Sequence, residues 1–264
     1  MVNIMLGIFN PEKGFSGGYE KLTGGRTFST SMAFGDLREN IKDGNALPVA
    51  YCVSISVMPE HSGGGYAKET LNYAIMFSLA NHFVAAPYSA PRRFRKARDK
   101  NPHLGIMDYL HMTTPQDISY EEFLVKSVVL MPKLTKLYGG RIEHSREVFD
   151  KYRNMDRDPV KAKPEETAYM QFLNNEGINL SRKYGRQMTI EDFCIISGRT
   201  LVDPVIGMHV SNGARFIRNS KGEIIAVFSE SRPEDLAAFG YNIVLSYTYN
   251  PMFGHEFASR KSGE

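Results

Sequence analysis

The sequence predicts a mixed α/β or α+β protein with a central sheet, and three features of its pattern predict it. An apolar, β-branched run at 47–59 is typical of a strand, and a glycine turn separates it from a helix-spaced segment at 66–83. A second short apolar run, at 83–89, indicates the next strand. Strand patterns return towards the C-terminus, after a long stretch of helical, charge-rich sequence.

The other elements are justified in chain order. Residues 1–45 are rich in Gly, Ser and Thr, which favours loops with one short strand near Arg26–Ser31. The helical pattern from about residue 100 to 186 indicates a helical insertion within a single 1–264 domain. There follow a helix at 188–198 with Thr189 as its N-cap, a strand-like segment at 203–208, a hairpin at 214–228 with its turn at 219–223, and a last strand at 241–249.

Composition narrows the class of protein. The chain has 264 residues, 42% of them hydrophobic and 23% charged, as in ordinary soluble globular proteins. A net charge of +3 is too small for a nucleic-acid footprint, and no apolar run approaches the roughly 20 residues of a membrane helix. Cys52 and Cys194 lie in apolar runs, which indicates buried thiols. The histidines lack metal-site spacing. We therefore expect a cytoplasmic protein without a signal peptide, a metal, a nucleic-acid partner or a membrane partner.

A glycine bend between strand and helix is the most specific local feature. Gly63, Gly64 and Gly65 follow the strand, and the helix begins at once with Tyr66 and Ala67. A helix start leaves backbone N–H groups without intrahelical partners, and glycines let an anion approach them closely. The pattern is not a Walker loop, because no Gly-Lys-Ser/Thr follows the glycines. It is not a dinucleotide fingerprint either, because the glycine spacing differs. It fits either a phosphate site or a plain glycine-rich connector.

The segment 57–67 also resembles a known signature. Its V-x-P-x-x-S-x-x-G-x-A pattern is similar to the coenzyme A motif of the GNAT superfamily of N-acetyltransferases, with Ser62 where that family usually has Gln or Arg. The resemblance implies a GNAT fold and a coenzyme A thioester, malonyl-CoA or acetyl-CoA, as substrate. It further implies that the strand before the bend pairs with the pantetheine amides. The implied binding residues are Ile55, Val57, Ser62, Gly63, Gly64, Gly65, Tyr66 and Ala67.

Three further segments resemble a branch of that superfamily. The run 203–214, D-P-V-x-x-x-H-x-x-N-G-A, is similar to malonyl-CoA decarboxylases and to the GNAT-like loading domains of polyketide synthases, such as the curacin type. The runs 231–235 and 88–94 resemble further segments of these proteins. The resemblance gives His209 the catalytic histidine position, Ser89 the hydroxyl position and Arg232 a position in acyl handling. The loading domains also use a tunnel tryptophan, and this chain has no tryptophan.

These residue types suit a decarboxylation. Loss of CO₂ from a malonyl thioester leaves an enolate, so a donor must face the thioester oxygen and an acid must protonate the α-carbon. His209 is able to do either, and the Ser89 hydroxyl is able to hold the departing carboxylate. Structural roles stay open beside these: a buried histidine for His209, a turn residue for Ser89 and a solvated side chain for Arg232.

The sequence leaves several functions open. The expected activity is decarboxylation of malonyl-CoA or methylmalonyl-CoA to acetyl-CoA or propionyl-CoA, with or without acyl transfer to an acyl carrier protein in polyketide initiation. The alternatives are a GNAT N-acetyltransferase acting on an amine and a non-catalytic, acyl-CoA-binding pseudo-GNAT module. A basic run at 92–100 indicates contact with the 3′-phosphate of coenzyme A or with an acidic carrier protein, or else a solvated helix face.

Overall fold

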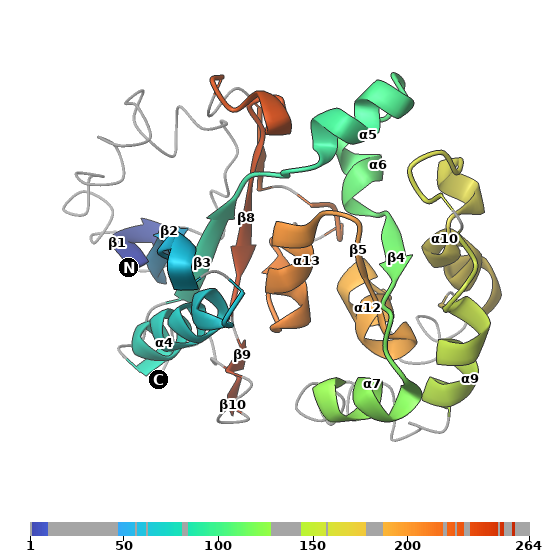
Figure 1. Ribbon diagram of the computed structural model, residues 1–264, viewed down its shortest axis with the longest axis horizontal. Helices are drawn as coiled ribbons and strands as arrows, with labels where there is room; N and C mark the ends of the chain where they lie inside the picture. Colours follow the sequence, from blue (N-terminus) through green and yellow to red (C-terminus); the bar gives the residue numbers. More distant parts are fainter. Residues whose placement is uncertain are drawn as a thin grey trace. The chain divides into compact units, whose positions relative to one another are not determined.

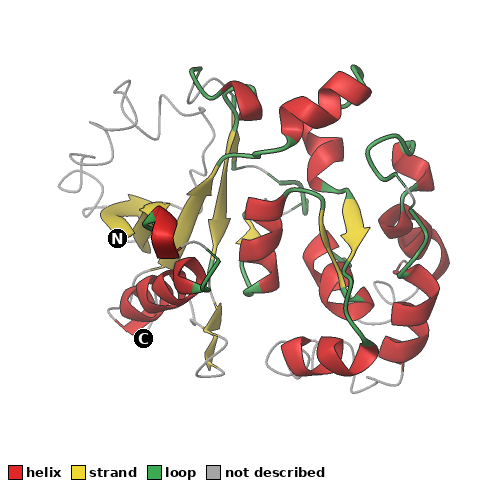
Figure 2. Cartoon of the chain, viewed as in Figure 1, coloured by secondary structure: helices red, strands yellow, loops and turns green. Residues whose placement is uncertain are grey.

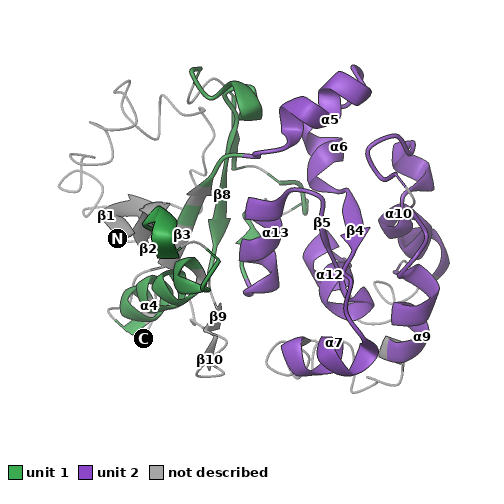
Figure 3. Cartoon of the chain, viewed as in Figure 1, with its two compact units in different colours: residues 1–90, 214–264 green, residues 91–213 purple. Residues whose placement is uncertain are grey.

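The computed structural model is mixed α/β, compatible with an α+β class, and forms two compact units. One unit comprises Met1–Ala90 and Ala214–Glu264, and the other is the continuous segment Pro91–Gly213 (Figure 3). The described residues are 2–9, 47–55, 57–61, 63–80, 84–127, 144–156, 158–177, 187–218, 221–224, 226–229, 233–247, 249–250 and 255–256.

The first unit contains a six-stranded sheet within the described residues (Figure 1). The strand order is β1-β2-β3-β8-β6, and β7 pairs with the same strand, β8. Its regular elements are β1 (Val2–Phe9), β2 (Leu47–Ile55), the short η1 (Pro59–His61), α4 (Tyr66–Ala80), β3 (Val84–Ser89), β6 (Arg215–Phe216), β7 (Val227–Phe228), η4 (Leu236–Ala238), β8 (Asn242–Ser246) and the separate β9–β10 pair (Tyr249–Asn250 and His255–Glu256).

The parallel pair β2–β3 is the part of this sheet that matters for the site. The two strands are joined through α4, as a parallel crossover requires. Their pairing runs from Val49↔Val84 to Cys52↔Pro87, and the last two residues of β3, Tyr88 and Ser89, pair with β8. β2 continues to Ile55, where its other edge still pairs with β1. Among the described residues, β3 therefore leaves β2 before β2 ends.

Helix α4 confirms the predicted helix, with a narrower buried face than expected. Leu71, Ala74 and Ile75 are buried, and the helix packs against β2 and β3. The apolar spacing of the segment 66–83 predicts Phe77 on that face, but Phe77 is 59% exposed, beside the 71% exposed Tyr73. The pattern overestimated the face because large aromatic side chains are also found on protein surfaces.

The second unit is mainly helical (Figure 2). A two-stranded antiparallel ladder, β4–β5, pairs Thr113 with Leu201 and Pro115 with Arg199. Its elements are α5 (Phe94–Lys100), α6 (Ile106–Leu110), β4 (Thr113–Pro115), α7 (Tyr120–Ser127), α9 (His144–Tyr152), η2 (Pro164–Glu166), α10 (Ala168–Phe172), the π-turn η3 (Leu173–Gly177), α12 (Ile190–Ser197), β5 (Arg199–Leu201) and α13 (Pro204–Ser211).

Aromatic side chains form much of the core of the second unit. The Phe193 ring lies 5.0 Å from that of Phe172 and 5.7 Å from that of Tyr152, distances typical of favourable aromatic pairs. Phe149 and Phe123 stack at 5.1 Å in an adjoining cluster. Cys194, on α12, is a buried free thiol, as its apolar surroundings predicted.

The remaining expectations have mixed outcomes. The helix after Thr189 is confirmed, because the Thr189 hydroxyl caps α12 by accepting from Asp192 N at 3.2 Å. The strand-like segment at 203–208 is wrong: it begins helix α13. The hairpin at 214–228 is present among the described residues only as the bridge Arg218↔Ile224, because its two strands pair with β8. The strand expected near Arg26–Ser31 lies outside the described residues.

Candidate functional site

The glycine bend starts α4 in a conformation that glycine favours. Gly63 and Gly65 have φ values of 88° and 79°, in the left-handed region. The first intrahelical bond runs from Glu69 N to Gly65 O at 3.1 Å, so the amides of Tyr66 and Ala67 precede the helical ladder. Apart from the chain neighbours, no atom of a described residue lies within 4 Å of the place where a Cβ on Gly63 or Gly65 would stand. The bend is exposed and leaves room for an anion beside the helix start.

Ser89 lies at the same edge of the sheet as the glycine bend. It is the last residue of β3, and the bend follows the end of the parallel neighbour β2. The carboxyl ends of parallel strands are where α/β sheets hold their ligands. Ser89 is only 4% exposed and pairs with Ile243 of β8. Two of the features singled out in the sequence are therefore brought to one edge of the first unit.

Helix α13 carries the third feature and is set by a buried carboxylate. Asp203 is its N-cap and accepts from Val205 N at 3.0 Å and Ile206 N at 3.1 Å, with Pro204 in the first turn. The other Asp203 oxygen accepts from Tyr109 Oη at 3.1 Å and from Arg93 N at 3.2 Å. Burial raises the pKa of Asp203 despite these donors. The sequence did not reveal that Tyr109 and Arg93 bond to Asp203, because they lie about 100 positions from it.

His209 lies in the last turn of α13 and is 5% exposed. Burial lowers its pKa from 6.5 to about 4, because the charged imidazolium is disfavoured away from water. The ring is therefore neutral at pH 7, with one nitrogen protonated and the other an acceptor. A neutral imidazole donates one hydrogen bond but is a poor acid, which favours the oxygen-facing role over protonation of carbon.

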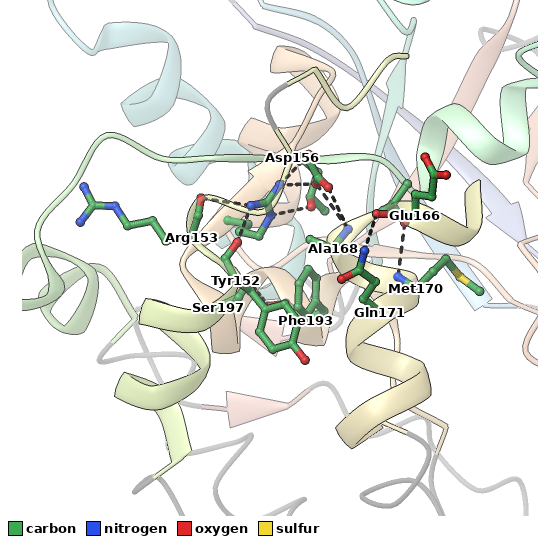
Figure 4. A network of polar contacts seen from close by, with 12 residues as sticks. Tyr152, Arg153, Asp156, Glu166, Ala168, Met170, Gln171, Phe193 and Ser197 are labelled. Atoms are coloured by element: carbon green, nitrogen blue, oxygen red, sulfur yellow. Dashed lines mark hydrogen bonds and ion pairs between the residues drawn. The ribbon is translucent and has the colours of Figure 1, made fainter. Parts of the chain in front are cut away.

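A second buried polar centre of the same unit surrounds Arg199, and there every donor of the guanidinium has an acceptor. The Arg199 guanidinium uses all five of its N–H donors: on Thr113 Oγ1 and O, on the carbonyls of Tyr152 and Arg153, and on Asp156 Oδ2 at 2.7 Å. Asp156 also accepts from Ala168 N at 3.1 Å (Figure 4). The Arg199 and Asp156 side chains are 0% and 2% exposed. This closed network ties β5 to β4 and to the segments around α9 and α10.

The basic run at 92–100 forms helix α5 and the two residues before it. Phe94 and Ala97 are buried, whereas Arg93, Arg95, Lys96 and Lys100 are exposed. A cationic surface of this kind fits both a solvated helix face and contact with an anionic partner.

The other residues singled out in the sequence lie as follows. Ile55 ends β2, and Val57 is half-buried just beyond it. Gly64 lies between the two left-handed glycines, and Tyr66 and Ala67 open α4. Ser62 and Arg232 lie outside the described residues. Ser89 and the glycine bend belong to the first unit and His209 to the second.

Among the described residues, no helix is long and apolar enough to cross a membrane. In the same part of the chain, no group of three or more His, Cys, Asp or Glu side chains is arranged to hold a metal ion. Comparisons with protein-family models, with curated proteins and with solved structures found no match to this chain.

Proposed function

We propose that this chain binds an acyl-CoA thioester and decarboxylates malonyl-CoA or methylmalonyl-CoA on a GNAT-type fold. The observation that carries the proposal is the shared edge of the first unit: a glycine bend that starts a helix, and a serine that ends the neighbouring parallel strand. A pyrophosphate suits the bend because helix N-termini favour anions and the space beside Gly63 and Gly65 is open.

The early end of the β2–β3 pairing supports the extended part of the same ligand. Between Val53 and Ile55, the edge of β2 that faced β3 carries backbone groups beyond the last β2–β3 pair. Extended molecules with amide groups bind to strand edges of this kind through main-chain hydrogen bonds. Pantetheine has two amides, so it is able to lie along β2 while its phosphates reach the bend.

The chemistry uses Ser89 and His209 in different roles. The C–C bond to the malonyl carboxylate breaks, CO₂ leaves, and the electron pair moves into the thioester as an enolate. Ser89 holds the carboxylate before it departs, and the N–H of the neutral His209 ring donates to the thioester oxygen as its charge grows. The α-carbon then takes one proton from solvent, which gives acetyl-CoA. Arg232 is proposed to handle the acyl group.

Within the second unit, the segment that follows β3 in sequence is bonded to the helix that carries His209. Only Ala90, Pro91 and Arg92 separate Ser89 from Arg93. The amide of Arg93 is bonded to Asp203, which caps the helix that carries His209.

Incubation with malonyl-CoA, read by mass spectrometry, tests the proposal. Acetyl-CoA formed without any added acceptor supports decarboxylation. Turnover that occurs only with acetyl-CoA and an amine would instead indicate an N-acetyltransferase, and binding without turnover would indicate a non-catalytic module.

His209→Ala should lower decarboxylation by about 10²- to 10³-fold, the usual cost of one donor to a developing oxyanion, and Ser89→Ala by less. The matched controls are the exposed His103→Ala and Ser211→Ala, which should behave like wild type. Circular dichroism and thermal unfolding separate lost chemistry from lost folding. Wild-type rates in both His209→Ala and Ser89→Ala would exclude the assigned roles.

Helix α5 offers a surface for an acidic acyl carrier protein. Its exposed cations, Arg95, Lys96 and Lys100, predict binding that weakens steeply with salt. Replacing the three by Glu should abolish that salt dependence without changing turnover of free malonyl-CoA. Unchanged carrier binding in this variant would leave a solvated helix face as the correct interpretation.

A further inference from the structure

The side-chain amide nitrogen of Asn212 is a buried donor without a hydrogen-bond acceptor among the described residues. Asn212 ends α13, and its backbone N–H donates to Met208 O and His209 O, each at 3.1 Å. Among the residues that the structure describes, its Nδ2 atom is buried and meets no acceptor. A buried polar group in this state costs about 1–3 kcal/mol and calls for an explanation.

Capping of the helix does not explain this amide. Gly213 takes the left-handed position after the helix, with φ 94°, and its N–H donates to Val210 O at 2.9 Å. This closes the C-terminus of α13 through the backbone alone, as glycine-ended helices commonly do. The side chain of Asn212 is not needed for it.

The position of Asn212 on α13 places it beside His209. The two are three residues apart, so their side chains are neighbours on the helix surface. Gly207 marks the side of α13 packed on β5, because a Cβ there would lie 2.8 Å from Thr200 Oγ1 and 3.1 Å from Leu201 O. At 3.6 residues per turn, His209 lies about 200° and Asn212 about 140° around the helix from Gly207. Both therefore point away from β5.

We infer that the Asn212 side-chain amide is a second hydrogen-bond donor, beside His209, for the thioester oxygen of the acyl-CoA substrate. The inference rests on the proposed function. The amide nitrogen is buried and meets no acceptor in the described part of the chain, and the developing enolate oxygen supplies that acceptor. A neutral histidine offers a single N–H, so the amide adds a second donor from the same helix end. Such preorganised donors stabilise the transition state without moving.

Asn212→Leu tests this, because leucine has a similar size and no donor. We expect the kcat for malonyl-CoA to fall by about 10²- to 10³-fold. We also expect thermal stability to stay equal or rise, because the unsatisfied amide is gone. The matched control is Asn154→Leu, an exposed residue of the same unit, which should keep wild-type turnover.

Asn212→Asp supplies a readout that a structural role would not change. At neutral pH the introduced carboxylate places a negative charge beside the forming enolate, so turnover should fall further than in Asn212→Leu. As the pH falls and the carboxyl group protonates, it becomes a donor again, and turnover relative to wild type should recover.

The outcomes separate the two proposals. Wild-type turnover in Asn212→Leu, or a melting temperature that falls in step with its activity, would overturn the donor role and leave the decarboxylase standing. Failure of the wild-type protein to form acetyl-CoA from malonyl-CoA would overturn the decarboxylase, and the donor role with it. Lost turnover with retained stability in Asn212→Leu, and acid recovery in Asn212→Asp, support the inference.

Discussion

The second unit contains two buried polar regions that differ in how their hydrogen-bonding groups are used. Around Arg199, every guanidinium donor meets an acceptor, and all five bonds reach residues more than 40 positions away in sequence. At the end of α13, His209 is buried as a neutral ring, and the Asn212 amide nitrogen meets no acceptor within the part of the chain that the structure describes. The difference teaches that burial alone does not mark a functional residue. A closed network stabilises the fold, whereas an unused buried donor leaves binding capacity for a ligand.

The largest expected effect is a loss of folding stability when the closed network around Arg199 is broken. Asp156→Ala leaves the Arg199 charge buried without its carboxylate and removes the acceptor for Ala168 N, so it should lower the free energy of unfolding by about 3–5 kcal/mol. Urea unfolding measures this. The matched control is Asp158→Ala, whose ion pair with Lys161 is partly exposed and should be worth less than about 1 kcal/mol. Equal losses in both variants would mean that the Arg199 network is not a buried one.

A somewhat smaller effect concerns pH and His209. The pKa of His209 is 6.5 in an exposed state and about 4 when folded, so the folded protein binds fewer protons between these values. Above pH 6.5 the ring is neutral in both states and does not lower the free energy of unfolding. As the pH falls towards 4, the unfolded state binds the proton first, and the free energy of unfolding falls by about 3 kcal/mol. Urea midpoints from pH 7 to pH 4 should fall less steeply in His209→Gln than in wild type.

The exposed His103→Gln serves as the control and should keep the wild-type slope. The raised pKa of Asp203 acts in the opposite sense, since stability from that group is lost as the pH rises. The difference between wild type and His209→Gln therefore isolates the histidine. Parallel slopes in the two proteins would show that the ring is not buried in its neutral form.

The smallest expected loss of stability comes from a substitution at the glycine bend of the first unit. Gly65→Ala forces a Cβ into the left-handed region without a clash, so strain alone should cost about 1–2 kcal/mol. Gly105→Ala is the control, because Gly105 has φ −76° and an added Cβ would meet only the movable end of the Asp108 side chain, at 3.3 Å, among the described residues. Under the proposed function, the added methyl of Gly65→Ala also fills space reserved for phosphate. Calorimetry should then show weaker coenzyme A binding, and unchanged binding would argue against a phosphate at the bend.

Local patterns predicted the elements of the first unit on which the candidate site is built. The strand β2, the glycine bend, helix α4 and strand β3 follow one another as expected, because each is specified by neighbouring residues. Helix α13 was misread because Val205 and Ile206 favour strands, although the Asp203–Pro204 pair is a helix-start signal. The partners of Arg199 and Asp203 were not predictable, because contacts between distant segments arise only from the folded chain. Asn212 was visible in its motif, but only the structure shows its unused amide.

The buried thiol of Cys194 makes local unfolding of the second unit measurable by thiol labelling. At 5% exposure, the sulfur is shielded from thiol reagents until the surrounding helices separate. In a Cys52→Ser background, the rate at which a small disulfide reagent labels Cys194 therefore reports how often α12 is uncovered. Labelling that slows when malonyl-CoA is added would show that the ligand holds this helical part of the chain closed.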